Sequence, residues 1–177
     1  MSKTVGDFFV DRLYEWGVRT IFGYPGDGIN GVLGALDRAG GKIQFIQVRH
    51  EEMGAFMAAA HAKFTGEPGV CLSTGGPGAA HMVTGLYDAK CDHVPVLAIC
   101  GQAPTTARGA HYQQELNLER LFQDVADYVY EASQPSQVRH LLDRAMRTAL
   151  GRNGVSVIVL PNDLQEKDYE DPPRKHG

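Results

Sequence analysis

The stretch GVCLSTGGPGAAHMVTGLYDAK, residues 69–90, passes from a strand to a helix across a glycine-rich turn. Residues 69–74 are uncharged and largely apolar, as in a strand that is covered on both of its faces. Pro77 suits the first turn of a helix, and we expect a helix over residues 76–90. A covered strand followed at once by a helix is the repeating unit of a parallel sheet, so this stretch predicts an α/β fold.

The same alternation continues on both sides of this stretch. Asp27 is the expected N-cap of a helix that follows the first strand. Because the strands are apolar throughout, we predict a doubly wound α/β fold with about six parallel strands and helices on both faces. The expected strands are 19–23, 43–48, 69–74, 94–101 and 155–161, and the expected helices are 5–17, 27–40, 51–66, 76–90, 117–125 and 135–151.

Composition and charge bound the domain organisation and the function. The 177 residues carry a net charge of −4, so we expect no nucleic-acid partner. The sequence shows no signal peptide and no apolar run that could span a membrane. Three cysteines without C-x-x-C spacing, Cys71, Cys91 and Cys100, are expected to be buried free thiols of a cytoplasmic protein. The domain should cover residues 1–163, and the polar residues 164–177 are typical of a linker toward further domains.

Three loops that follow predicted strands should meet at one edge of the sheet, where parallel α/β folds bind ligands. They lie in residues 23–28, 49–52 and 73–78, and the polar segment 102–115 would form a fourth wall. The first loop has the G-x-G-x-x-G spacing of a dinucleotide-binding turn, at Gly26, Gly28 and Gly31. A dinucleotide-binding module is therefore one alternative, although Asp27 would place a carboxylate beside the pyrophosphate.

Glu51 directly follows His50 at the end of a predicted strand. The residues after it are small, so another group could approach the helix closely. A partly desolvated carboxyl group there is suited to sharing a proton with a ligand nitrogen. Glu52 is equally well explained by the stabilisation of acidic residues at a helix N-terminus. The histidines at 81, 93 and 111 show neither H-x-x-x-H nor H-E-x-x-H spacing, so we predict no metal site.

Three motifs resemble the N-terminal, pyrimidine-binding domain of thiamine-diphosphate enzymes. They are RHEEMGAFMAAAHAKFTG at residues 49–66, STGGPGAAHMVTGLYDA at 73–89 and DHVPVLAICGQAP at 92–104. The resemblance runs from about residue 4 to about residue 163. It is greatest to pyruvate oxidase and the quinone-dependent pyruvate dehydrogenase, followed by acetolactate synthase. It implies an enzyme domain that takes part in the decarboxylation of a 2-keto acid such as pyruvate.

The resemblance assigns roles to individual residues. Glu51 matches the glutamate that hydrogen-bonds N1′ of the pyrimidine and favours the imino tautomer, which takes the proton from the thiazolium C2. His81 stands where the synthases carry Asn and agrees better with the pyruvate-oxidase branch, whereas Gln113 stands where they carry Phe. The residues that match cofactor contacts are Tyr24, Pro25, Gly26, Glu51, Pro77, Gly78, His81 and Gln114.

The resemblance also implies what this chain lacks. In the family a separate domain binds the diphosphate and Mg²⁺ through G-D-G and an Asn roughly thirty residues later, and FAD is bound by a middle domain. Residues 26–28 read G-D-G, but no Asn follows at that interval, so those groups are expected on absent domains. The implied partner is the diphosphate domain of a neighbouring subunit in a homodimer or homotetramer, and any membrane association would involve absent regions.

Several functions stay open at this point. The chain is expected to be inactive alone, as the first part of a pyruvate-type enzyme of the oxidase branch. An acetolactate synthase-type carboligase is an alternative within the family, and so is the small subunit of a split 2-keto acid decarboxylase. The dinucleotide-binding module is the alternative outside it.

Overall fold

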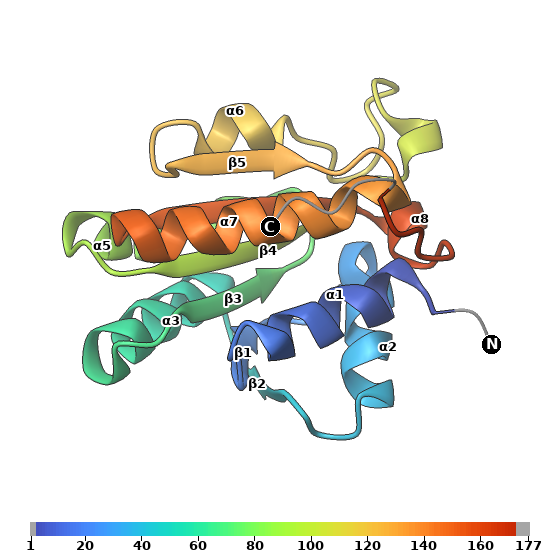
Figure 1. The fold of residues 1–177 in the computed structure, drawn as a ribbon. Helices are drawn as coiled ribbons and strands as arrows, with labels where there is room; N and C mark the ends of the chain where they lie inside the picture. Colours follow the sequence, from blue (N-terminus) through green and yellow to red (C-terminus); the bar gives the residue numbers. More distant parts are fainter. Residues whose placement is uncertain (1–2, 173–177) are drawn as a thin grey trace.

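The computed structural model describes residues 3–172, which build a six-stranded, all-parallel sheet (Figure 1). The predicted α/β fold with about six parallel strands is therefore confirmed. The strand order is β2-β1-β3-β4-β6-β5, so the order reverses between β1 and β3, and ligands bind at such switch points. The strands are β1 (Thr20–Gly23), β2 (Gln44–Gln47), β3 (Gly69–Ser73), β4 (Val96–Gln102), β5 (Tyr128–Glu131) and β6 (Val155–Pro161).

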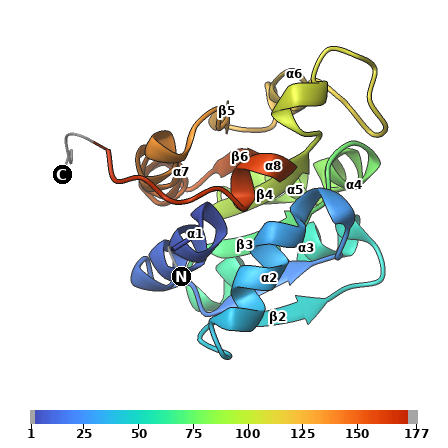
Figure 2. The same ribbon diagram turned by 90° about the vertical axis from the view of Figure 1, so that its right-hand side faces the viewer.

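Helices cover both faces of the sheet, as Figures 1 and 2 show. Successive side chains along each strand point to opposite faces of the sheet and pack into two separate cores. In β3, Val70 and Leu72 belong to the first core and Cys71 belongs to the second. The first core is closed by α1 (Val5–Glu15), α2 (Asn30–Arg38), α7 (Val138–Arg152) and α8 (Asn162–Gln165). The second is closed by α3 (Glu51–Thr65), α4 (Pro77–His81), α5 (Val83–Cys91) and α6 (Leu118–Phe122).

The structure corrects four local expectations. Strand β5 was not predicted; it lies at the sheet edge, and its side chains are only partly covered. The helix expected over residues 76–90 is two helices, α4 and α5, which meet at Met82. Asp27 is not an N-cap but lies inside the short 3₁₀ helix η1 (Asp27–Ile29), which precedes α2. Cys91 is exposed, whereas the other two cysteines are buried free thiols as predicted.

The first and last described segments are held together. The backbone of Thr4 pairs with that of Asp168 in an antiparallel bridge, and the Tyr169 ring stacks on Phe8 with the ring centroids 3.7 Å apart. The beginning of the expected linker therefore packs against α1. The domain boundary at residue 163 stays a prediction, and residues 173–177 of the linker lie outside the described residues.

Candidate functional site

The loops that carry the predicted site residues meet at the carboxyl edge of the sheet. The loop after β1 contacts the loop after β3, because the Gly28 N–H donates to Thr74 Oγ1 at 3.1 Å. The loop after β4 reaches the same place, since a Cβ at Gly76 would overlap the Gln114 carbonyl oxygen. The structure therefore brings the predicted segments together at the switch point between β1 and β3.

Glu51 is the first residue of α3 and is 9% exposed. The preceding His50 is the N-cap of this helix, and its Nδ1 accepts a hydrogen bond from the Glu52 N–H at 3.3 Å. Glu51 Oε2 lies 2.9 Å from His81 Nδ1. A Cβ at Gly78 would lie 3.1 Å from Glu51 Oε1, so glycine at this position keeps space beside the carboxyl group. Three of the predicted residues, Glu51, Gly78 and His81, are thus immediate neighbours.

The small residues of α3 face the protein rather than a ligand. Ala55 and Ala58 are fully buried, and a Cβ at Gly85 of α5 would lie 2.6 Å from the Ala55 Cβ. The expectation that these small residues let another group approach the helix closely is confirmed, and that group is α5. They are small because α3 packs closely on β3 and α5, and a larger side chain would push these elements apart.

The opposite face of α3 carries large apolar side chains that are exposed. Met53, Phe56 and Phe64 are 52%, 39% and 90% exposed. Their spacing of three and eight residues places them on one side of the helix. The helix therefore has its small residues inside and its large apolar residues outside, the reverse of an ordinary surface helix. Exposed apolar faces of this kind occur at surfaces that bind proteins, membranes or ligands.

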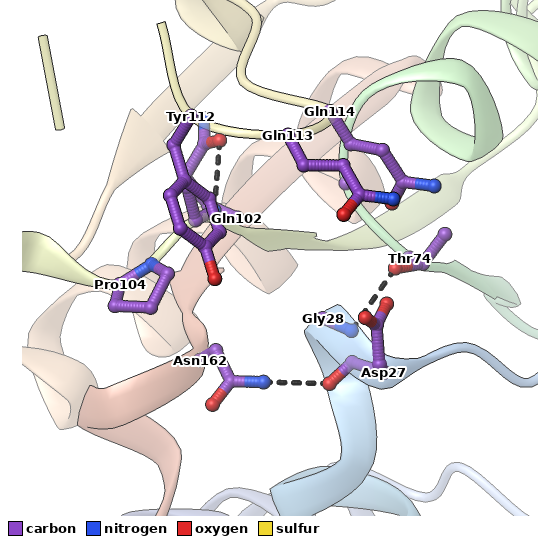
Figure 3. A pocket seen from close by; sticks show the side chains of 11 residues that line it. Asp27, Gly28, Thr74, Gln102, Pro104, Tyr112, Gln113, Gln114 and Asn162 are labelled. Carbon is purple, nitrogen blue, oxygen red and sulfur yellow. Dashed lines mark hydrogen bonds between the residues drawn. The ribbon is translucent and has the colours of Figure 1, made fainter. Parts of the chain in front are cut away.

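A pocket of about 170 Å³ lies beside the glycine turn after β3. Figure 3 shows that Tyr112, Gln113 and Gln114, from the loop after β4, line one side of the pocket. Asp27 and Asn162 line the opposite side. Asp27 carries the only charge among its lining residues, and most other polar groups are amides and hydroxyls. Gln114 has a left-handed backbone with φ of 61°, a strained conformation of the kind that gathers at functional sites. The pocket suits a small polar ligand.

The glycines of the first loop serve close packing within the protein. A Cβ at Gly31 would lie 2.5 Å from the Gln165 Cβ. The Gln165 side chain accepts a hydrogen bond from the Val32 N–H at the start of α2 and donates one to the Gly28 carbonyl oxygen at 2.8 Å. The Gly28 N–H is already used by Thr74. Because the Gly28 and Val32 N–H groups have internal acceptors, they are not available to a pyrophosphate, which argues against the dinucleotide-binding alternative.

Four residues that shape the site were not predicted as site residues, although His50 and Thr74 lie in segments that were expected to form it. Thr74, Asn162 and Gln165 fix the first loop by hydrogen bonds, with Asn162 Nδ2 donating to the Asp27 carbonyl oxygen at 2.6 Å. His50 holds the start of α3 and stacks on His81. Their positions in the sequence could have indicated a role in the site, because each residue follows a strand at the carboxyl edge of the sheet.

Comparison with known proteins assigns this arrangement to a family. Residues 3–121 match the family model described as "Thiamine pyrophosphate enzyme, N-terminal TPP binding domain". The chain belongs to the thiamine pyrophosphate enzyme family. The resemblance found in the sequence motifs is thereby confirmed, and the domain is part of a family of thiamine pyrophosphate-dependent enzymes.

Relatives of this thiamine pyrophosphate-binding domain include enzymes of two kinds. It is 47% identical to pyruvate oxidase of Lactiplantibacillus plantarum over 90% of the chain and 26% of the relative. It is 46% identical to a Bacillus subtilis protein with the provisional name "thiamine pyrophosphate-containing protein YdaP", over 92% of the chain and 28% of the relative. It is 38% identical to acetolactate synthase of Arthrospira platensis over 93% of the chain and 29% of the relative.

The chain thus spans less than a third of the length of these thiamine pyrophosphate enzymes. Within residues 3–172, no helix combines the length and the apolar character needed to cross a bilayer.

Proposed function

We propose that this chain is the pyrimidine-binding domain of a thiamine-diphosphate enzyme that decarboxylates pyruvate, with Glu51 as the residue that activates the cofactor. The supporting observation is the buried Glu51 carboxyl group at the switch point of the sheet, with open space maintained by Gly78. When bound, thiamine diphosphate supplies the electron sink for decarboxylation. The residues that would hold its pyrimidine half are Tyr24, Pro25, Gly26, Glu51, Pro77, Gly78, His81 and Gln114.

In this proposal Glu51 holds or moves the proton at N1′ of the pyrimidine ring. Its position suits the task, because a carboxyl group that is 9% exposed exchanges protons with its bound partner more readily than with bulk water. His81 Nδ1, 2.9 Å from Glu51 Oε2, orients the carboxyl group. In the first loop, the Gly28 N–H is not available to a diphosphate, because it donates to Thr74 Oγ1.

The pyruvate-oxidase branch is the first candidate, supported by 47% identity to pyruvate oxidase. An acetolactate synthase-type carboligase is the second, supported by 38% identity to acetolactate synthase. In either case we assign Mg²⁺ and the diphosphate, and for the oxidase branch FAD, to domains beyond this chain. We place the protein in the cytoplasm, in agreement with its free cysteines.

The partner that we propose is the diphosphate-binding domain of a neighbouring subunit in a homodimer or homotetramer. The apolar outer face of α3, with Met53, Phe56 and Phe64, begins two residues after Glu51 and is the surface proposed to meet it.

A domain exchange tests this proposal. The N-terminal quarter of the pyruvate oxidase from Lactiplantibacillus plantarum is replaced by this chain, and pyruvate turnover is measured with thiamine diphosphate, Mg²⁺ and FAD. We expect the chimera to be active and Glu51→Gln to reduce its turnover by about 10²–10⁴-fold, the usual contribution of a proton-transferring side chain.

Glu52→Gln is the matched control for this experiment, because it changes the adjacent carboxyl group of the same helix turn and should leave turnover near that of the parent chimera. The chain without the other domains is the negative control. Equal activities of the Glu51→Gln and Glu52→Gln chimeras would refute the role of Glu51.

A further inference from the structure

Two histidines and one glutamate converge although their sequence spacing does not reveal it. His50 and Glu51 come from the start of α3, and His81 is the last residue of α4. One donor atom from each of the three side chains lies within 4.8 Å of the other two. The rings of His50 and His81 are stacked with centroids 4.5 Å apart and an interplanar angle of 27°.

We propose that His50, Glu51 and His81 form a binding site for a transition-metal cation of the Zn²⁺ class, which competes with the pyrimidine ring for Glu51. The competition rests on the proposed function. The metal site itself does not, because it depends only on the three side chains.

The donor set determines which cations fit. Two imidazoles and one carboxylate are the protein ligands of many zinc sites that keep a fourth position open. Mg²⁺ and Ca²⁺ prefer sites made of oxygen ligands alone, so this site discriminates against the cation that accompanies thiamine diphosphate. His81 Nδ1 already lies 2.9 Å from Glu51 Oε2, so two of the three proposed ligands are close together.

The three ligands combine fixed and adjustable parts. Glu51 is held at the N-terminus of α3 with its side chain 11% exposed, and His50 is fixed as the N-cap. The His81 side chain is 46% exposed, so a cation can reach the site from solvent. Ligand atoms of one tetrahedral zinc ion, each about 2.0–2.2 Å from the metal, lie closer together than 4.8 Å. A rotation of the exposed His81 ring would bring its ligand nitrogen closer to the donor atoms of His50 and Glu51.

Calorimetry with ZnCl₂ on the chain carrying Cys91→Ser tests the metal site, because this background removes the exposed thiol as a competing ligand. We expect one site whose affinity falls by about tenfold or more on His81→Asn and on His50→Asn, since each removes one ligand. Asn at position 50 still serves as an N-cap, so that variant keeps the start of α3. MgCl₂ should produce no binding heat.

His93→Asn is the matched control, because His93 is exposed in a turn with a left-handed backbone that Asn also adopts. It should leave zinc affinity unchanged, and circular dichroism should show the same fold in every variant. Zinc affinity in His81→Asn equal to that of the parent, or equal losses in His81→Asn and His93→Asn, would overturn the proposed site.

The competition is measured separately by titrating thiamine with and without saturating ZnCl₂. We expect zinc to weaken thiamine binding in the Cys91→Ser chain and to have no effect in His81→Asn. Thiamine binding that is indifferent to zinc, in a chain that binds both, would overturn the competition. A chain that binds zinc through the three residues but shows no thiamine binding would instead contradict the proposed function and leave the metal site in place.

Discussion

At the scale of single residues, Gln165 has the strongest influence on the shape of the first site loop. It is fully buried, and its Nε2 donates to the carbonyl oxygens of Gly28 at 2.8 Å and Leu160 at 2.9 Å. Its Oε1 accepts from the Val32 N–H at 3.3 Å. One side chain therefore joins α8, the end of β6, the first loop and the start of α2. Buried amides with every polar atom paired specify a single local arrangement.

Replacing Gln165 by Ala removes these hydrogen bonds and leaves buried backbone groups without partners. We expect the free energy of unfolding to fall by about 2–4 kcal/mol, because unsatisfied buried polar groups are costly. Urea unfolding followed by circular dichroism measures the change. Glu166→Ala, at the exposed adjacent position, should change stability by no more than about 0.5 kcal/mol. Equal effects of the two substitutions would contradict the role of Gln165.

At the scale of elements, one buried carboxylate joins α1 to α7. Asp143 of α7 accepts hydrogen bonds from Arg12 Nε at 2.8 Å, from Arg12 Nη2 at 3.0 Å and from Trp16 Nε1 at 2.8 Å. Burial alone would raise the pKa of Asp143, but the hydrogen bonds from Arg12 and Trp16 outweigh burial and lower this pKa below its ordinary value. The carboxylate form therefore stabilises the packing of the two helices.

The lowered pKa of Asp143 predicts how stability depends on pH. Its contribution is fully present above the unfolded-state pKa of about 3.9 and is lost as pH falls through the folded-state pKa. We expect Asp143→Asn to cost about 2–3 kcal/mol at pH 7, as for hydrogen bonds to a charged group, and the difference from the parent to shrink below about pH 4.

Urea unfolding of both proteins at pH 7 and pH 3 measures this difference. Glu15→Gln is the control, because Glu15 is the exposed ion-pair partner of Arg12 and should have little effect at either pH. A loss in Asp143→Asn that is the same at both pH values would rule out the carboxylate as its cause.

The sequence predicts the bounds of some elements more accurately than those of others. Strands whose side chains are buried on both faces of the sheet were predicted most accurately. Strands β4 and β6 are covered on both faces and have a continuous apolar pattern, so they were predicted closely. Edge strand β5 lacks that pattern and was missed. Glu51 and Gly78 were found because a family motif contains them, whereas Thr74 and Gln165 act through contacts between distant segments that no local pattern encodes. The same applies to the meeting of His50 and His81.

At the scale of the whole molecule, the outer face of α3 is the surface that we propose for contact with other chains. Its apolar residues Met53, Phe56 and Phe64 lie close to the start of the helix that carries Glu51. A face of this kind on an isolated domain favours self-association, because burying apolar surface is favourable. We therefore expect the isolated domain to self-associate through this face.

Phe64→Ser tests this property. Because Phe64 is 90% exposed, the substitution should change the free energy of unfolding by no more than about 0.5 kcal/mol while reducing the self-association of the isolated chain. Sedimentation velocity over a range of concentrations measures association. Leu150→Ser, a similar change at a 37% exposed position on α7, should leave association unchanged. Identical sedimentation of the parent and Phe64→Ser would argue against an associating α3 face.

The bridge between Thr4 and Asp168 has a consequence for how such a domain can be exchanged. The first and last segments of the domain, at Thr4 and Asp168, lie side by side, and all six strands come between them in the sequence. A domain with this layout can be inserted into another protein, because the two attachment points in that protein need only be close together. The same layout makes the domain a suitable subject for circular permutation, with new ends opened in the exposed turn at residues 40–42.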